Sequence, residues 1–501
     1  MKDILRSRLS ESLDELAASF ISSLKDDMEI IEADIIGTLA HDYMLFKRNI
    51  ISKKDIKSIS KALLEIREDV IKGNFNLDNI YEDIHPLIEA RVIEKIGIET
   101  GGKIHSGRSR NDQVAVDIRL KLRDYLLDIR KCVLELVSKV LEKAKKHAGT
   151  PFPLYTHLQP AQIGTFGHLL CGWAFELLRH ANRLAECFQR TNMSPLGACA
   201  IGGTAFPIDR AITADILGFF GYIQNSMDAI SSRDVIIENT ADLANLSVFY
   251  SRIAEDLIIY SSSEYRFIDL PEKFCSVSSV LPQKKNPDTL ELLRAKAASS
   301  ISALDAELVL AKGTPSGYNR DFQDCKPPLW RIFPDLIMAT RLLAKIIEDL
   351  ELREEQIKAS LEKSDLQALD LAEQICLSHD IPFRKAHELM ATVVKYLKSK
   401  GKNISSAWTQ SELEDIKAMC KRVVGDEHAI DENFIKLARK VDSFTTRQSA
   451  GSPSPNSMTE MLMLAGQELE RLSNALSIEV SKIQEKKESF LKTIKELINS
   501  P

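Results

Sequence analysis

The stretch Val277-Ser278-Ser279-Val280-Leu281-Pro282-Gln283-Lys284-Lys285-Asn286-Pro287-Asp288 decides how the rest of the chain is interpreted. Its first half is polar and serine-rich, which predicts irregular structure. Its second half begins a helix: Asn286 can cap it, Pro287 suits the first helical position, and Asp288 favours the positive end of the helix dipole. Lys284 and Asn286 therefore lie where free backbone N–H groups point outward, an arrangement that binds anions. The alternative is an ordinary capped loop with solvated lysines.

A second polar cluster, His105-Ser106-Gly107-Arg108-Ser109-Arg110-Asn111-Asp112-Gln113, also precedes a long helix. Asn111 or Asp112 can cap that helix. Apolar residues then recur three or four apart, as is typical of a bundle helix. They are Ile118, Leu122, Tyr125, Ile129, Val133, Leu136 and Val140. Arg110 and Asn111 thus offer a guanidinium and an amide to a carboxylate at a helix N-terminus, although a solvated helix cap is the other interpretation.

Two further polar segments contain histidines. His157 lies in a predicted loop, Tyr155-Thr156-His157-Leu158-Gln159-Pro160-Ala161-Gln162, where it could transfer protons near neutral pH. A structural histidine bonded to a backbone carbonyl is the alternative. His85 lies in Glu82-Asp83-Ile84-His85-Pro86, a polar break before a helix. Such a histidine is usually a surface or capping residue, and Asp83 could orient it.

The composition of the chain narrows the expected fold class and the expected kinds of binding partner. The chain has 501 residues with only 21 glycines and 17 prolines, and strand-like alternation is scarce, so a mainly helical protein is expected. The net charge of −6 is small against 66 basic and 72 acidic residues, and the basic residues form no block, so neither nucleic acid nor membrane is an expected partner. No apolar run approaches the roughly 20 residues of a membrane helix, and Met1-Lys2-Asp3 opens no signal peptide. The eight cysteines include no Cys-x-x-Cys pair, as expected of free thiols in a reducing cytoplasm.

The second half of the chain predicts further helices. A long one follows Pro287 and ends before Gly313-Thr314-Pro315. Its apolar stripe is Leu290, Leu293, Ala297, Ile301, Leu304, Leu308 and Ala311. Glu291 lies one residue off this stripe and can face a polar cleft. A linker, 450–456, precedes a last amphipathic helix. We expect an N-terminal helical domain (1–107), a central long-helix bundle (108–362), a small C-terminal helical domain (363–450), and a linker with the terminal helix (451–501).

The Ser-Ser-x-x-Pro-Gln-Lys-Lys-Asn-Pro-Asp form of the first stretch resembles the fumarase/aspartase superfamily of lyases, and is most similar to the argininosuccinate lyase family. The likeness extends residue for residue from Gly107 to Gln113, and to Thr156–Gln159, Glu82–His85 and Tyr318–Lys326. It covers the chain from about Leu13 to Leu476. The resemblance implies an all-α, three-domain fold with a long central helical bundle. It also implies a homotetramer with a core of packed long helices, in which three subunits assemble each active site.

The resemblance also implies the roles of individual residues. Ser278 is the catalytic base, with Lys284 beside it in the loop. His157, oriented by Glu291, protonates the departing nitrogen or shuttles its proton. The substrate-binding residues implied in the same way are Asp83, His85, Ser109, Arg110, Asn111, Thr156, Arg233, Asn286, Tyr318, Gln323 and Lys326. The acids are too few for a metal cage and there is no nucleotide loop, so neither a metal nor a cofactor is expected.

The positive charges and amides suit a substrate rich in carboxylates. Such a site can remove a proton next to a carboxylate and expel the β-substituent, because fixed positive donors stabilise the charge that develops. The argininosuccinate lyase family cleaves argininosuccinate to arginine and fumarate in arginine biosynthesis. Two alternatives remain: a related carbon–nitrogen lyase acting on another N-succinyl compound such as adenylosuccinate, and a non-enzymatic structural protein of the same fold, as some lens crystallins are.

Overall fold

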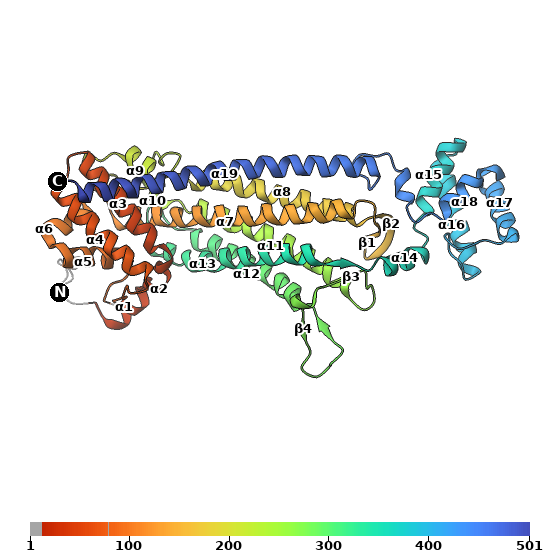
Figure 1. Cartoon of the computed structure of the whole chain (residues 1–501), viewed down its shortest axis with the longest axis horizontal. Coiled ribbons are helices and arrows are strands. Elements are labelled where there is room, and N and C mark those ends of the chain that lie inside the picture. The colour runs from red at the N-terminus through yellow and green to blue at the C-terminus, as the bar shows by residue number, and fades with distance from the viewer. Residues whose placement is uncertain (1–12, 79) are drawn as a thin grey trace.

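A computed structural model describes residues 13–78 and 80–501, and this part of the chain is built almost entirely of helices (Figure 1). The expected all-α fold is confirmed. The N-terminal region contains α1 (Glu15–Ile21), α2 (Leu24–Asp27), η2 (Met28–Ile30), α3 (Ile31–Lys47), α4 (Lys53–Ile71), α5 (Ile84–Ile96), α6 (Ile98–Gly101) and η3 (Gly102–His105). Residues 1–12 and 79 of the expected first domain lie outside the described residues.

Long helices lie side by side along the molecule (Figure 1). They are α7 (Arg110–Lys146), α8 (Phe166–Thr191), α11 (Asp234–Ser261), α12 (Asp288–Ala311), α13 (Lys326–Asp349) and α19 (Pro455–Asn499). At 1.5 Å per residue, the 37 residues of α7 span about 55 Å and the 45 residues of α19 about 68 Å. Shorter helices connect the long ones: α9 (Arg210–Ile216), α10 (Ser226–Ser231), η4 (Glu272–Phe274) and η5 (Arg320–Gln323).

The helix α7 illustrates how the bundle is packed. Its predicted apolar stripe is buried throughout, except that Tyr125 is half-buried and stacks on Phe333 with ring centroids 5.0 Å apart. The cap differs from the prediction, because Ser109 is the N-cap and Asp112 closes a capping box with it. Asn111 lies inside the first turn instead.

The apolar core has two separate large parts. One continuous cluster of buried side chains extends from Leu24 in the N-terminal region through the bundle to Ile494 in α19. The other, from Leu371 to Ala438, lies within the small helices at the opposite end of the molecule (Figure 1). These helices are α14 (Glu354–Glu362), α15 (Ala368–His379), α16 (Phe383–Ser399), α17 (Gln410–Val424), η6 (Glu427–Ala429), α18 (Glu432–Ala438) and η7 (Ser443–Thr446). The apolar clusters thus separate 371–438 from the bundle, whereas the N-terminal region shares the core of the bundle.

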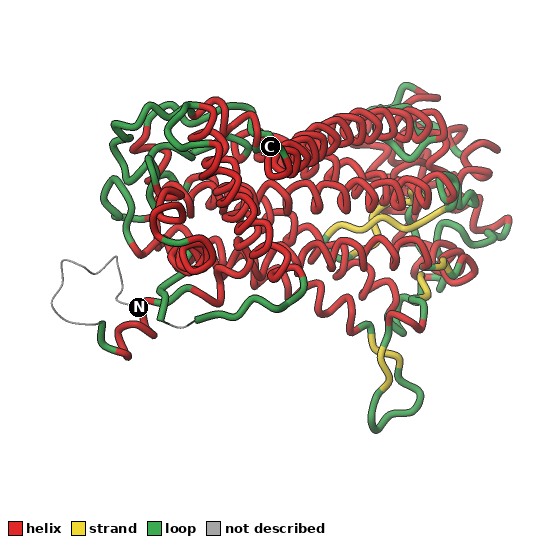
Figure 2. Tube along the Cα trace, turned by 60° about the vertical axis from the view of Figure 1, so that its left-hand side comes forward, coloured by secondary structure: helices red, strands yellow, loops and turns green. Residues whose placement is uncertain are grey.

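Short strands form the only sheets among the described residues (Figure 2). They are paired as β1 (Pro151–Thr156) with β2 (Gln159–Thr165), β3 (Ile268–Asp269) with β6 (Glu351–Leu352), and β4 (Ser276–Val277) with β5 (Lys285–Asn286), each pair antiparallel. The loop expected at 155–162 is therefore wrong: it is the tip of the β1–β2 hairpin. Asn286 likewise pairs in β5 and does not cap α12, which begins at Asp288 with Pro287 in the capping position.

The stripe predicted for α12 is only partly correct. Leu290, Leu293 and Ala297 are buried, but Ile301 and Leu308 are each about half exposed (48%). In this half of the helix Ser300, Ala303 and Glu307 face the chain's own core. In the second half of α12 the apolar stripe and the buried face of the helix are therefore on different sides. Among the described residues no helix is long and apolar enough to cross a membrane.

Candidate active site

The β4–β5 hairpin carries Ser278 and Lys284 on a loop that extends away from the bundle (Figure 2). Ser278 accepts hydrogen bonds at Oγ from the backbone N–H groups of Val280 (3.3 Å) and Leu281 (3.0 Å). Lys284 is exposed. The base of the hairpin is fixed, because Lys285 donates to Asp269 Oδ1 at 3.0 Å and to the Leu270 carbonyl at 2.7 Å. The hairpin thus has an anchored base and an open tip.

The start of α12 brings two further candidates to the hairpin. Asn286 Nδ2 donates to Ser276 Oγ at 3.5 Å, and Ser276 donates to Asp288 in the first turn of α12. Glu291 lies exposed on the same turn. Ser278, Lys284, Asn286 and Glu291, which we call the hairpin group, therefore share one end of α12.

Thr156 and His157 lie at the tip of the β1–β2 hairpin and form what we call the turn group. His157 and Leu158 make the two-residue turn, and both have φ of +54°. A type I′ turn requires positive φ at both positions and normally uses asparagine or glycine. Backbone strain of this kind is found at functional sites. The His157 side chain is exposed and is therefore free to meet a partner from outside this chain.

Asp83, His85 and Arg110 form a connected set at the opposite end of α7. Asp83 caps α5 by accepting from the His85 backbone N–H at 3.0 Å, and its carboxylate contacts Nδ1 of the His85 ring at 2.9 Å. Arg110 Nη1 donates to Asp83 Oδ2 at 2.7 Å and to Glu82 Oε2 at 3.1 Å. Both of these bonds use Nη1. Among the described residues no hydrogen bond from Nε or Nη2 is seen, so these two nitrogens can donate to a substrate carboxylate.

His85 itself is buried, and both of its ring nitrogens face carboxylates. Its Nε2 lies 3.1 Å from Asp117 Oδ2 and 4.0 Å from Asp34 Oδ1. Burial opposes the imidazolium, but Asp83, Asp117 and Asp34 outweigh it and raise the pKa of His85 well above its ordinary value. Burial would also raise the pKa of Asp83, but His85 and Arg110 hold it well below the ordinary value. Within the described structure both ring nitrogens of His85 are therefore occupied by carboxylates, and His85 contacts Arg110 only through Asp83.

Ser109 and Asn111 complete the start of α7. Ser109 Oγ accepts from the Asn111 backbone N–H at 3.3 Å. The Asn111 side chain donates to the Ala200 carbonyl at 2.9 Å, which holds the glycine-containing loop at 194–204 against the helix start. The first turn of α7 thus presents Arg110 from a fixed backbone.

The segment from Tyr318 to Lys326 packs against the N-terminal region. Gln323 Nε2 donates to the Ile21 carbonyl at 3.1 Å, and Lys326 is buried in an ion pair with Asp27. Burial raises the pKa of the Tyr318 phenol, with Arg233 opposing it. The positive charge that the sequence assigned to Lys326 as a substrate contact is therefore neutralised by Asp27 in this chain.

Arg233 is also buried. Its Nη1 donates to the Ile230 and Ser232 carbonyls at 2.9 and 2.8 Å, and its guanidinium lies 4.5 Å from the Phe322 ring centroid. Glu307 of α12 lies nearby, with the Cys325 thiol against its carboxylate. Burial raises the pKa of Glu307 to about 7. Arg233, which the resemblance implies as a substrate-binding residue, is thus enclosed by the described chain.

The predicted residues thus fall into three groups in space. The third, which we call the N-terminal group, consists of Asp83, His85, Ser109, Arg110, Asn111, Arg233, Tyr318, Gln323 and Lys326. It lies at the start of α7 and beyond the end of α12. The turn group follows the end of α7, about 55 Å away, and the hairpin group begins α12, whose 24 residues span about 36 Å. One chain therefore does not bring the N-terminal group together with the other two.

Sequence reasoning missed several residues that lie against the N-terminal group. Asp117 lies seven residues after Arg110, a spacing that places both on one face of α7 and could have revealed it. Asp34 and Glu307 gave no such signal. Asp34, His85 and Asp117 have ligand-type atoms within 4.8 Å of one another, but the proton on the raised-pKa imidazolium already accounts for that cluster.

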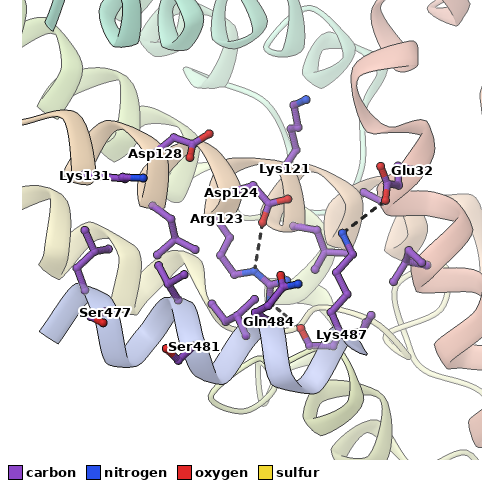
Figure 3. A pocket seen from close by; sticks show the side chains of 18 of the residues that line it. Glu32, Lys121, Arg123, Asp124, Asp128, Lys131, Ser477, Ser481, Gln484 and Lys487 are labelled. Atoms are coloured by element: carbon purple, nitrogen blue, oxygen red, sulfur yellow. Dashed lines mark hydrogen bonds and ion pairs between the residues drawn. The ribbon is translucent and has the colours of Figure 1, made fainter. Parts of the chain in front are cut away.

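A separate groove of about 940 Å³ lies between α7 and α19 (Figure 3). Lys487 of α19 reaches Glu32 across one end of it at 3.5 Å, and Arg123 and Asp124 of α7 lie 4.0 Å apart along its wall. Within the described structure none of the predicted site residues lines this groove. It is therefore not part of the candidate site.

Comparison with known proteins identifies the family. A lyase family model matches residues 7–301, and a model of the argininosuccinate lyase C-terminal region matches residues 365–438. The chain is 39% identical over 493 residues to argininosuccinate lyase of Nitrosopumilus maritimus, covering 98% of this chain and all of that one. The chain belongs to the argininosuccinate lyase family. The argininosuccinate lyase of Methanocorpusculum labreanum is also 39% identical, over 93% of both chains.

Solved structures agree with this assignment. EDDS lyase in complex with formate superposes with a TM-score of 0.84 at 25% identity, over 97% of this chain and 95% of that one. A class II fumarase from Schistosoma mansoni gives a TM-score of 0.67 at 16% identity, over 84% of this chain and 96% of that one, and shares the fold. The chain is thus a carbon–nitrogen lyase with a fumarase/aspartase-like fold.

Proposed function

We propose that this lyase cleaves argininosuccinate to L-arginine and fumarate in the cytoplasm, as a step of arginine biosynthesis. The near-full-length relationship to argininosuccinate lyases supports the substrate. The chemistry is supported by the polar groups gathered at helix starts, where Arg110 and Lys284 can grip carboxylates. A cleavage of this kind needs no group beyond the side chains proposed below.

In the proposed reaction Ser278 removes a proton from the succinyl carbon next to a carboxylate. The electron pair left behind is held as an aci-carboxylate by fixed positive donors, which bind it more tightly as charge develops. The carbon–nitrogen bond on the neighbouring carbon then breaks, giving fumarate. The departing guanidinium nitrogen receives a proton from His157, oriented by Glu291, or from Ser278.

The hairpin geometry supports Ser278 as the base. A serine hydroxyl is a poor base at its ordinary pKa and needs its charged form stabilised. The backbone N–H groups of Val280 and Leu281 already point at Oγ, and Lys284 lies on the same loop. Closure of the exposed loop over substrate would exclude water and strengthen these interactions.

We further infer that the enzyme is a homotetramer whose sites are shared between subunits. The separation of the N-terminal group from the other two supports this, because a complete site then needs more than one chain. Exposed apolar residues on the bundle helices support it as well, since large apolar patches mark interfaces. They are Val248, Leu292, Ile301, Leu308, Val309 and Met338.

The proposed function is tested by measuring fumarate release, followed by ultraviolet absorbance, from argininosuccinate and adenylosuccinate side by side. We expect turnover of argininosuccinate alone. Turnover of adenylosuccinate alone would assign the enzyme to the alternative N-succinyl substrate, and inactivity with both would support a structural homologue.

A further inference from the structure

A closed ring of contacts joins α5 and α7 at the candidate site. Arg110 and Asp117 lie two turns apart on the same face of α7. Between them, Arg110 donates to Asp83 at 2.7 Å, Asp83 contacts His85 Nδ1 at 2.9 Å, and His85 Nε2 lies 3.1 Å from Asp117. The contacts therefore start and end on one helix, which fixes the Asp83 carboxylate relative to the α7 axis.

A third helix, α3, braces this ring. Asp34 Oδ1 lies 4.0 Å from His85 Nε2 and accepts a hydrogen bond from Gln113 Nε2 at 3.1 Å. Asp34, His85 and Asp117 are all buried, so water does not compete for these bonds. In such surroundings each charge–charge contact is strong, and an unpaired group is costly.

The ionisation of His85 is coupled to that of the carboxyl groups around it. Burial, reinforced by Asp34, raises the pKa of Asp117 to about 8, while the carboxylates raise the pKa of His85. Asp34, Asp83 and Asp117 face the ring from α3, α5 and α7, and Arg108 and Arg110 are the cations nearby. The coupled cluster therefore retains protons at neutral pH, and the imidazole can donate to Asp83 and to Asp117 at once.

We propose that Asp117 and Asp34 are positioning residues for the lyase reaction. They hold the His85 imidazolium, which holds Asp83, which orients the Arg110 guanidinium so that its free N–H groups face the substrate carboxylate. This inference rests on the proposed function and extends it to two residues that do not touch the substrate. Replacing either carboxylate by a neutral amide weakens its hold on the His85 ring, and so weakens the hold on Asp83 and the guanidinium.

A double-mutant cycle tests this claim, with kcat/KM for argininosuccinate as the readout. Asp117→Asn should lower kcat/KM about tenfold in the wild-type background, mainly through KM. In the Arg110→Ala background the same substitution should cost less than about twofold, because residues acting through one contact are not additive. A purely structural role would give equal losses in both backgrounds, and that result would overturn the proposal.

Asp42→Asn is the matched control. Asp42 is another fully buried acid of the N-terminal region, on the same helix as Asp34, but it has no hydrogen bond to the ring among the described residues. We expect kcat/KM to be unchanged in both backgrounds at pH 7. A loss as large as that of Asp117→Asn would show that replacing any buried acid here has the same effect, contrary to the proposal.

Two further measurements distinguish a failure of the positioning role from a failure of the proposed function. If Asp117→Asn does not give folded enzyme, Asp34→Asn enters the same cycle, with an expected loss of about threefold in the wild-type background alone. Equal losses in both backgrounds would again refute the positioning role. A wild-type enzyme inactive on argininosuccinate would instead contradict the proposed function, and the cycle would then be run on the substrate that is turned over.

Discussion

Ser278 and its neighbour Ser279 differ in how the hairpin uses their hydroxyl groups. Ser278 Oγ accepts from two backbone N–H groups, whereas within the described chain no comparable bond is made by the exposed Ser279. Donors aimed at an oxygen favour its charged form. This difference favours Ser278 over Ser279 as the catalytic base, as the motif also implies. The role of Ser278 as the base remains a prediction.

We expect Ser278→Ala to lower kcat by about 10²–10⁴-fold, the usual cost of losing a positioned base, with KM nearly kept. The fold should survive because the loop is exposed. Ser279→Ala is the matched control and should be much milder. Steady-state kinetics decides the matter: near-normal turnover of Ser278→Ala, with loss in Ser279→Ala or His157→Ala, would move the base to one of those positions.

Asp42 predicts a pH effect on stability. Burial raises its pKa to about 8, whereas the unfolded chain titrates near 3.8. Between these values the folded state binds more protons than the unfolded state, so the free energy of unfolding falls as pH rises from about 4 to about 8 and levels off above that.

An asparagine side chain does not titrate, so Asp42→Asn removes this contribution to the pH dependence of stability. We expect the Tm of the variant to exceed that of the wild type by a larger margin at pH 8 than at pH 5, because the folded wild type retains a proton that its unfolded chain gives up across this range. Calorimetry at the two pH values measures this. A difference in Tm that does not change with pH would contradict the raised pKa.

At the scale of elements, α19 ties the two ends of the molecule together. It begins next to the small C-terminal helices and runs the length of the bundle, and its far end packs on α3 and α4 (Figure 1). There Phe490 is buried with its ring edge-on to Tyr43 at 5.8 Å, and Lys57 donates to the Ser500 carbonyl. The end of α19 therefore stabilises the N-terminal region.

Phe490→Ala should lower the free energy of unfolding by about 3–5 kcal/mol, as is usual for a buried phenylalanine, and leave kcat/KM of the folded enzyme unchanged. Lys482→Ala, an exposed position on the same helix, should stay within about 0.5 kcal/mol of the wild type. Chemical denaturation compares the two. Equal effects would mean that the end of α19 is not a stabilising contact.

The sequence predicted the elements that depend on local periodicity and missed those that depend on distant partners. The stripe of α7 was predicted almost completely because its own chain covers it. Ile301 and Leu308 of α12 were expected in a core, but the single chain leaves them exposed. The turn at His157–Leu158 could not be predicted, because neither residue favours the positive φ that it adopts.

The candidate site shows the same division. The motif residues are recognisable because they lie in short polar segments before helices. Lys326, however, is buried against Asp27, nearly three hundred residues earlier in the sequence, and Asp34 braces His85 from another helix. Pairings between such distant residues are set by tertiary packing, which no local pattern encodes.

At the scale of the whole molecule, the proposed sharing of sites between subunits means that no single chain holds a complete active site. The N-terminal group lies about 55 Å along α7 from the turn group and about 36 Å along α12 from the hairpin group. An assembly of several chains side by side would bring opposite ends of the bundle together, and the exposed apolar residues of α12 would then be covered.

Mixed assemblies of two impaired variants test whether the sites are shared between subunits. Ser278→Ala and Arg110→Ala subunits are unfolded together, refolded at equal ratio, and assayed for fumarate release from argininosuccinate at concentrations below KM. If Ser278 and Arg110 of one site come from different subunits, about a quarter of the sites in random assemblies carry both intact residues, so activity should rise well above that of either parent treated alike. Activity no higher than the mean of the two parents, with mixed assembly verified, would show that each site is built from one chain and would rule out shared sites.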